Sequence, residues 1–95
     1  MILKDEVGEF CTARSHPIMP RLKQTAEGAI AAQKVMDVDM RGVKLMSVSF
    51  LDEWLGDLAA RLGVEQTLKW IRFSPPLAAE YLQQLDRSAT LRKRP

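Results

Sequence analysis

The sequence has little of the two residue types on which disulfide frameworks and most transition-metal sites depend. It contains one cysteine, Cys11, and one histidine, His16, among 95 residues. A single cysteine excludes an internal disulfide, and so few cysteine and histidine ligands do not make a metal cluster of the usual three or four. We therefore expect a protein of a reducing, cytoplasmic compartment that holds no metal.

Long apolar runs and a strong net charge are also missing. No stretch approaches the ~18–20 apolar residues of a membrane span, and the first ten residues lack the basic start and apolar core of a signal peptide. The formal net charge is +2, so no overall field favours nucleic acid or an acidic membrane. The glycines lack the spacing of a phosphate loop, and we expect no cofactor and no membrane association.

What the sequence does contain is the pattern of one α/β domain covering residues 1–95, with a basic, frayed tail at 88–95. Alternation and β-branched residues predict strands, and apolar residues at helical spacing predict helices. The expected strands are 1–7, 34–40, 43–48 and 66–74, and the expected helices are 21–33, 49–63 and 76–91. The order β-α-β-β-α-β-α favours a small mixed sheet of about four strands that is covered by helices.

The helix expected over residues 49–63 has the clearest signal in the chain. Its apolar stripe spans Phe50, Leu51, Trp54, Leu55, Leu58, Ala59 and Leu62. Ser49 is expected to cap the helix N-terminus, with Asp52 returning a hydrogen bond from the first turn. Gly63 is well placed to end it.

Catalytic and metal-binding constellations are weak. His16 could act as a general base and Cys11 as a nucleophile, but no third group is evident, and each is also an ordinary surface or packing residue. Asp37 and Asp39 share one strand face and could hold a metal ion, or could simply line the polar side of that strand. These residues keep a small enzyme as an alternative, although we expect none.

Two features could contact nucleic acid. The segment "LAARLGVEQTLKW", residues 58–70, is similar to the centre of helix-turn-helix domains, but the residues after its turn favour a strand and are followed by two prolines. The chain also ends in a basic stretch, which could touch phosphates or be a solvated end: Arg87, Arg92, Lys93 and Arg94. A DNA-associated module is therefore a second alternative.

Several residues in order carry a family resemblance. The chain contains "DMRGV" at 39–43, "SFLDE" at 49–53 and "GDL" at 56–58, preceded by "GEFCTAR" at 8–14. This set resembles the STAS-like domain family of unknown function, related to the STAS domains of anti-sigma factor antagonists. The motif positions are Arg14, Asp39, Gly42, Val43, Phe50 and Gly56.

The resemblance implies a STAS-like sheet with helices mainly on one face, and a bacterial signalling role without catalysis. STAS antagonists bind an anti-sigma factor that is also a histidine-kinase-like ATPase, which phosphorylates a serine at the start of the helix after the third strand. Ser49 matches that serine and is the candidate phosphosite. The chain departs from the antagonists at Ser47, Val48 and Phe50, where they have an acidic residue, a serine and a glycine.

The expected function is a non-catalytic regulatory or protein-interaction domain. Its partner surface is expected at Ser47, Ser49, Asp52 and Glu53. Ser49 can be a helix cap alone or a cap that is also phosphorylated, and the charges of Asp52 and Glu53 would repel the phosphate. The open edges of the sheet also allow a homo-oligomer.

Overall fold

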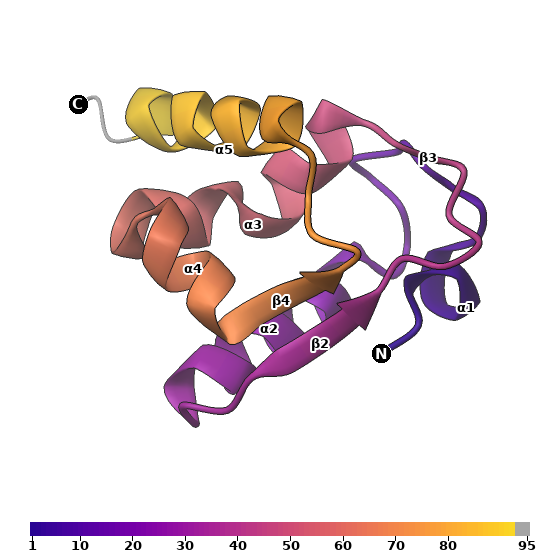
Figure 1. Cartoon of the computed structure of the whole chain (residues 1–95), viewed down its shortest axis with the longest axis horizontal. Coiled ribbons are helices and arrows are strands. Elements are labelled where there is room, and N and C mark those ends of the chain that lie inside the picture. The colour runs from indigo at the N-terminus through magenta and orange to yellow at the C-terminus, as the bar shows by residue number, and fades with distance from the viewer. Residues whose placement is uncertain (93–95) are drawn as a thin grey trace.

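The structure, a computed structural model, describes residues 1–92 and is a small, compact α/β protein (Figure 1). That range contains five helices and four strands. The strands form two parallel sheets of two strands each. None of these helices is long and apolar enough to cross a membrane. In chain order the elements are α1 (Leu3–Val7), β1 (Phe10–Cys11), α2 (Met19–Ala31), β2 (Met36–Asp39), β3 (Leu45–Met46), α3 (Val48–Leu62), α4 (Val64–Trp70), β4 (Ile71–Ser74) and α5 (Ala79–Arg92).

The predicted single mixed sheet is wrong, because the four strands pair in two separate sheets. Strand β2 pairs with β4 from Met36↔Ile71 to Asp39↔Ser74, and β1 pairs with β3 through Phe10↔Leu45 and Cys11↔Met46. The first residues of the chain occupy the second edge of β2, where the Asp39 amide donates to the Met1 carbonyl at 2.7 Å. Strand β3 therefore has no place beside β2 and bonds to β1 instead.

The strand predicted over residues 1–7 is reduced to a single bridge between Ile2 and Asp39, followed by helix α1. Leu3 and Val7 are four residues apart, so they lie on one helical face, and Leu3 is fully buried. In a strand these two residues would also share a face. Over so short a run, their spacing does not distinguish a helix from a strand.

The strand predicted over residues 66–74 begins only at Ile71, since residues 64–70 form α4. Thr67 is fully buried, and its hydroxyl donates to the Gly63 carbonyl one turn earlier at 2.9 Å. Leu68 packs against the core on the same side of this short helix. Packing against α3 and α5 thus overrides the local preference of threonine and tryptophan for a strand.

The C-terminal end differs from expectation as well. The helix predicted over residues 76–91 is confirmed as α5, but the tail predicted to fray from residue 88 is wrong as far as residue 92, because residues 88–92 form the last turn of α5 and Ala89 is buried. The rest of the predicted tail, residues 93–95, lies outside the described part of the chain.

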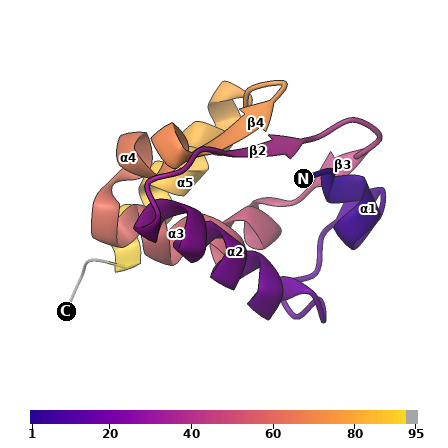
Figure 2. The same cartoon turned by 90° about the horizontal axis from the view of Figure 1, so that it is seen from below.

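Helix α3 is the centre of the molecule. In Figure 1 it runs beside α5 and above the β2–β4 pair, and in Figure 2 α2 and α3 lie on the same side of that pair. The predicted stripe is confirmed at every position except Leu62, which is 41% exposed. The other face of the β2–β4 pair carries polar side chains, among them the exposed Asp37 and Arg72.

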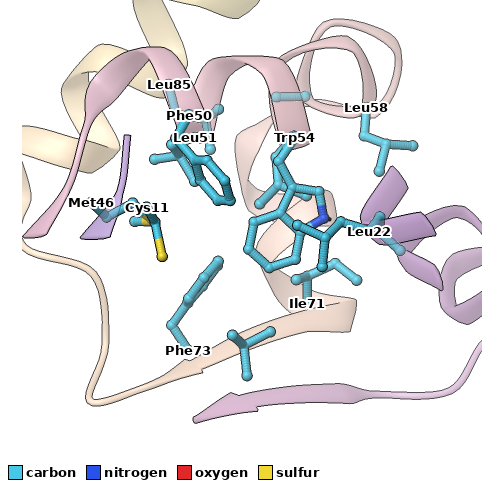
Figure 3. Packing of buried hydrophobic residues seen from close by; sticks show 14 of the residues in the cluster. Cys11, Leu22, Met46, Phe50, Leu51, Trp54, Leu58, Ile71, Phe73 and Leu85 are labelled. Atoms are coloured by element: carbon cyan, nitrogen blue, oxygen red, sulfur yellow. Dashed lines mark hydrogen bonds between the residues drawn. The ribbon is translucent and has the colours of Figure 1, made fainter. Parts of the chain in front are cut away.

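The core lies where α3 meets α2 and β4 (Figure 3). Trp54 contacts Phe50 and Phe73 edge to face, with ring centres 6.2 and 5.7 Å apart. Its indole N–H donates to the Leu22 carbonyl of α2 at 3.1 Å, so its one polar atom is satisfied inside the core. This packing fixes how α3 begins and which of its residues face solvent.

Candidate functional site

The cap of α3 is Ser47, so the prediction of Ser49 as cap is wrong. The Ser47 hydroxyl accepts the Phe50 backbone N–H at 3.0 Å and donates to the Thr12 carbonyl at 3.3 Å. The Ser47 backbone N–H also donates to the Cys11 carbonyl at 2.9 Å, which continues the pairing of β3 with β1. Ser47 is thereby held in extended geometry, which is the conformation a helix cap requires.

Ser49 is therefore the second residue inside α3 rather than the residue before it. Its side chain is exposed in the first turn. Phe50 beside it is fully buried and points into the core, so its ring does not cover the serine (Figure 3). The sequence analysis had assigned both the helix cap and the candidate phosphosite to Ser49. In the structure Ser47 is the cap, and Ser49 is an exposed hydroxyl in the first turn.

Asp52 and Glu53 are held by cations from three other segments, a group that we call the ion-pair cluster. Its members are Arg14, Lys23, Asp52, Glu53 and Arg92. Arg14 reaches Asp52 at 2.8 Å and Glu53 at 3.3 Å, Lys23 reaches Glu53 at 2.8 Å, and Arg92 reaches Asp52 at 3.1 Å. Asp52 consequently does not return a capping bond to the helix start, and both carboxylates predicted to face a partner are paired within the chain.

The cluster also sets the ionisation of both acids. Burial raises the pKa of Asp52, but hydrogen bonds from Arg14, Arg92 and Ser88 outweigh burial and leave this pKa below its usual value. The hydrogen bond from Lys23 is the main reason why the pKa of Glu53 is lowered, and Arg14 adds to it. Both carboxylates are therefore charged at neutral pH, and the three cations give the cluster a formal charge of +1.

Gly56 makes room for this cluster in the middle of α3. A Cβ atom at Gly56 would lie 2.6 Å from Asp52 Oδ1 and 2.7 Å from Arg92 Nε, both far closer than van der Waals contact. Glycine inside a helix costs about 1 kcal/mol relative to alanine. Here the missing side chain allows Arg92, the last residue of α5, to pack directly against α3. The motif residues Arg14 and Gly56 thus meet at Asp52, although 42 residues separate them in the sequence.

The remaining motif residues shape the chain between β2 and β3. Asp39 accepts the Arg41 backbone N–H at 2.9 Å and the Arg41 Nε–H at 2.8 Å, which closes a tight turn. Gly42 has a φ of +82°, and a Cβ there would also meet Lys4 Cδ at 2.6 Å. Val43 is half-buried against the core. These residues therefore have structural roles in the turn that leads to β3.

An exposed apolar pair lies on β1 and β3, and the sequence did not indicate it. Phe10 and Leu45 are register partners on the outward side of this short sheet and are 59% and 51% exposed. Val48, at the start of α3, is 41% exposed. No strand was predicted between residues 8 and 20, so the placement of Phe10 outside and Cys11 inside was not foreseen.

The residues considered for catalysis or metal binding have other contacts. Cys11 is fully buried, and burial raises the pKa of its thiol, which opposes the thiolate form. His16 Nδ1 accepts the Ile18 backbone N–H at 3.2 Å. Asp37 is exposed, and Asp39 is paired with Arg41 at 2.7 Å. Within residues 1–92, no three His, Cys, Asp or Glu side chains are grouped so that they could hold a metal ion.

The segment that resembles a helix-turn-helix is helical on both sides of its turn. Residues 48–70 form two consecutive helices joined at Gly63, whose φ is +88°. The expected strand immediately after the turn, one argument against this motif, is absent. The second helix nevertheless has only seven residues, and its exposed side chains include Glu65 as well as Lys69.

Comparison with known proteins adds no relative: no family model matches the chain, and no curated protein or solved structure matches it.

Proposed function

We propose that the chain is a non-catalytic, STAS-like regulatory domain of the cytoplasm, which binds a protein partner through the start of α3. The candidate partner is a histidine-kinase-like ATPase or an anti-sigma factor. The observation that carries the proposal is Ser49, an exposed hydroxyl in the first turn of α3 beside acids whose charges are already compensated.

The convergence of the motif residues supports this proposal. Arg14, Asp52, Glu53 and Gly56 come from three separate parts of the motif and meet in one cluster. If the two short helices α1 and α4 are set aside, the remaining elements follow the order β-α-β-β-α-β-α that the sequence pattern predicted, although the first strand is Phe10–Cys11 rather than residues 1–7. The proposed fold is therefore a STAS-like domain whose sheet is divided in two.

The electrostatics at Ser49 favour a phosphate more than the sequence alone suggested. Asp52 and Glu53 lie three and four residues after Ser49, so they are its neighbours on the helix surface. Because Arg14, Lys23 and Arg92 outnumber them, the surroundings of Ser49 are not net acidic. The N-terminus of α3 adds a favourable dipole for an anion. Arg14, whose side chain is 49% exposed, is the cation best able to turn toward a phosphate.

The surroundings of Cys11 and His16, the two residues considered for catalysis, do not fit the roles of nucleophile and general base. A reactive cysteine needs a lowered pKa and access to solvent, whereas the Cys11 thiol is buried with a raised pKa. A general base needs a free ring nitrogen aimed at its substrate, whereas His16 Nδ1 is occupied by the Ile18 backbone.

The proposal is tested with purified wild-type, Ser49→Ala and Ser49→Asp domains as baits in extracts of the cells that produce the protein. We expect wild-type and Ser49→Ala to retain an ATPase of the serine-kinase type. Ser49→Asp should bind it about tenfold more weakly, because it mimics the modified state. Thr25→Asp, at an exposed hydroxyl on α2, is the matched control and should bind like wild-type. Equal retention by Ser49→Asp would contradict the switch.

A DNA-associated module is the second candidate, and the helix pair α3–α4 is the observation that favours it. A recognition helix places its exposed residues against base edges and phosphates. The exposed acid Glu65 and the small size of α4 disfavour this role. A salt-dependent shift of a DNA probe by the purified domain would support the alternative over the first proposal.

A further inference from the structure

Arg14 has a central place among the cations of the ion-pair cluster. It bonds to both acids, Asp52 at 2.8 Å and Glu53 at 3.3 Å. Lys23, from α2, pairs with Glu53 at 2.8 Å. Arg92, from α5, pairs with Asp52 at 3.1 Å. Arg14 therefore lies between two ion pairs that are complete without it, and its departure would leave each acid with a cation of its own.

Arg14 also has hydrogen-bonding capacity that the cluster does not use. Its Nη1 atom donates to both acids, and its Nε and Nη2 atoms donate to no group of residues 1–92. Arg92 differs, because its Nε and Nη2 atoms both donate to the Asp52 carboxylate, at 3.4 and 3.1 Å. Two neighbouring guanidinium nitrogens form the fork that binds a carboxylate or a phosphate through parallel hydrogen bonds. Arg14 is thus the arginine of the cluster with a free fork.

Ser49 lies in line with Arg14 along the surface of α3. A helix turns by about 100° per residue, so Asp52 is about 60° to one side of Ser49 and Glu53 about 40° to the other. A group that bonds to both carboxylates is therefore centred on the line through Ser49. Helical side chains also lean toward the N-terminus of their helix, which brings the carboxylates and Arg14 toward the serine. The exposed Ser49 hydroxyl and the Arg14 guanidinium are thus neighbours on α3.

The charges of the cluster can accommodate a phosphate if Arg14 turns toward it. A phosphate on serine carries a charge of about −1.5 to −2 at neutral pH. Arg14 belongs to the turn between β1 and α2, where residues 12–15 are all exposed, and its own side chain is 49% exposed. With Arg14 on the phosphate, Lys23 still neutralises Glu53. Arg92 likewise still neutralises Asp52, so every anion has a cationic partner.

We propose that Arg14 binds the phosphate of a modified Ser49 through its Nε–Nη2 edge and gives up its bonds to Asp52 and Glu53. This inference rests on the proposed function, in which a kinase partner transfers the γ-phosphoryl group of ATP to Ser49. In that transfer the bond between Ser49 Oγ and the γ-phosphorus forms, and the bond from this phosphorus to the leaving ADP oxygen breaks. The hydroxyl proton goes to solvent. The modified state then differs from the unmodified one in the position of the turn that carries Arg14.

The probe is the domain with phosphoserine incorporated at position 49 during translation, and phosphorus NMR follows the titration of its phosphate. A bound guanidinium favours the doubly charged phosphate. The titration midpoint of the wild-type should therefore lie about 0.5–1 pH unit below that of Arg14→Gln. Arg14→Lys keeps the charge but loses the fork, so its midpoint should lie between the two. Equal midpoints for the wild-type and Arg14→Gln would overturn the proposal.

Arg72→Gln is the matched control for the loss of one positive charge. Arg72 is exposed on β4, on the face of the β2–β4 pair that carries polar side chains, and it is not part of the cluster. The phosphate of this variant should titrate like that of the wild-type. A midpoint that moves as much with Arg72→Gln as with Arg14→Gln would reflect net charge alone, and it would overturn the assignment of Arg14.

Thermal unfolding measures the same coupling without reference to the phosphate signal. In the unmodified domain Arg14→Gln should lower Tm by at most about 4–8 °C, because exposed ion pairs contribute little and both acids keep a cation. Phosphoserine at position 49 should lower Tm more in Arg14→Gln than in the wild-type, since only the wild-type has the arginine that neutralises it. Equal effects of phosphoserine in both backgrounds would overturn the proposal, and so would a larger loss of Tm by Arg14→Gln in the unmodified domain.

Neither measurement needs a partner protein, so the two proposals can fail separately. If the phosphate titrates as expected but Ser49→Asp retains the partner, Arg14 binds the phosphate and the proposed switch is contradicted. If Ser49→Asp loses the partner but the titration is the same with and without Arg14, the switch stands and the role of Arg14 is overturned.

Discussion

Replacing Ser47 by alanine should weaken the fold, whereas the same change at Ser49 should not. Ser47→Ala removes the oxygen that accepts the Phe50 backbone N–H at 3.0 Å, together with the hydroxyl that donates to the Thr12 carbonyl. The variant leaves the Phe50 N–H unpaired in the first turn of α3, the helix around which the core is built. Ser49 is exposed inside the first turn, and exposed substitutions of this kind usually change stability by less than about 0.5 kcal/mol.

The size of the effect follows from the loss of a helix cap, which costs about 0.5–2 kcal/mol. For a domain of this length, 1 kcal/mol corresponds to a shift in Tm of about 4–8 °C. We therefore expect Ser47→Ala to lower Tm by about 4–8 °C for a typical cap loss of about 1 kcal/mol, and by about 2–16 °C over the whole range, and to reduce the urea midpoint with an unchanged m-value. Ser47→Asn keeps a capping oxygen and should recover most of the loss.

Thermal unfolding followed by circular dichroism, together with urea titration, measures all three variants under the same conditions. The reasoning would be refuted if Ser49→Ala lost more stability than Ser47→Ala. It would also be refuted if Ser47→Asn were as unstable as Ser47→Ala, because the capping oxygen would then not account for the effect.

Two further predictions concern the glycines of the long helices and the ion-pair cluster. Gly28→Ala, where a Cβ would meet nothing within 4 Å, should raise the free energy of unfolding by about 1 kcal/mol. Gly56→Ala should not show this gain, because the new Cβ displaces Arg92 from Asp52; equal gains in urea titrations would contradict this role of Gly56. The lowered pKa values of Asp52 and Glu53 imply a stabilisation that is complete above their unfolded pKa values of about 4 and is lost as pH falls through the lower folded values. Between pH 5 and pH 3 the free energy of unfolding, measured by urea titration, should therefore fall more for the wild-type than for Asp52→Asn. An equal fall in both proteins would contradict a stabilising role of the charged Asp52.

Some features of the fold followed from local pattern alone. The apolar stripe of α3 repeats at helical spacing over four turns, and Gly63 ends this helix as predicted. The alternation of Met36, Val38 and Met40 predicted β2, in which Val38 is fully buried. Signals of this length and regularity are strong, because every residue in them agrees on one period.

Other features depended on distant contacts that no local pattern contains. The ion-pair cluster joins Arg14, Asp52 and Arg92, and no spacing rule relates residues so far apart in the chain. The cap of α3 is Ser47 because β1 holds its backbone extended through the Cys11 carbonyl. The sequence pattern favoured Ser49 as the cap, because Asp52 follows it at the spacing of a capping box.

The sequence by itself determined that this is a small α/β chain with α3 as its main core helix, because burial of a regular apolar stripe dominates the folding free energy of such a segment. Only the tertiary structure decided that the strands divide into two sheets, that residues 64–70 are helical, and which serine faces solvent. The physical reason is that each of these outcomes depends on which distant segment supplies the backbone hydrogen bonds or packing contacts. The start of the chain takes the second edge of β2, helix α4 packs against α3 with Thr67 buried, and β1 fixes Ser47, so that Ser49 is left exposed.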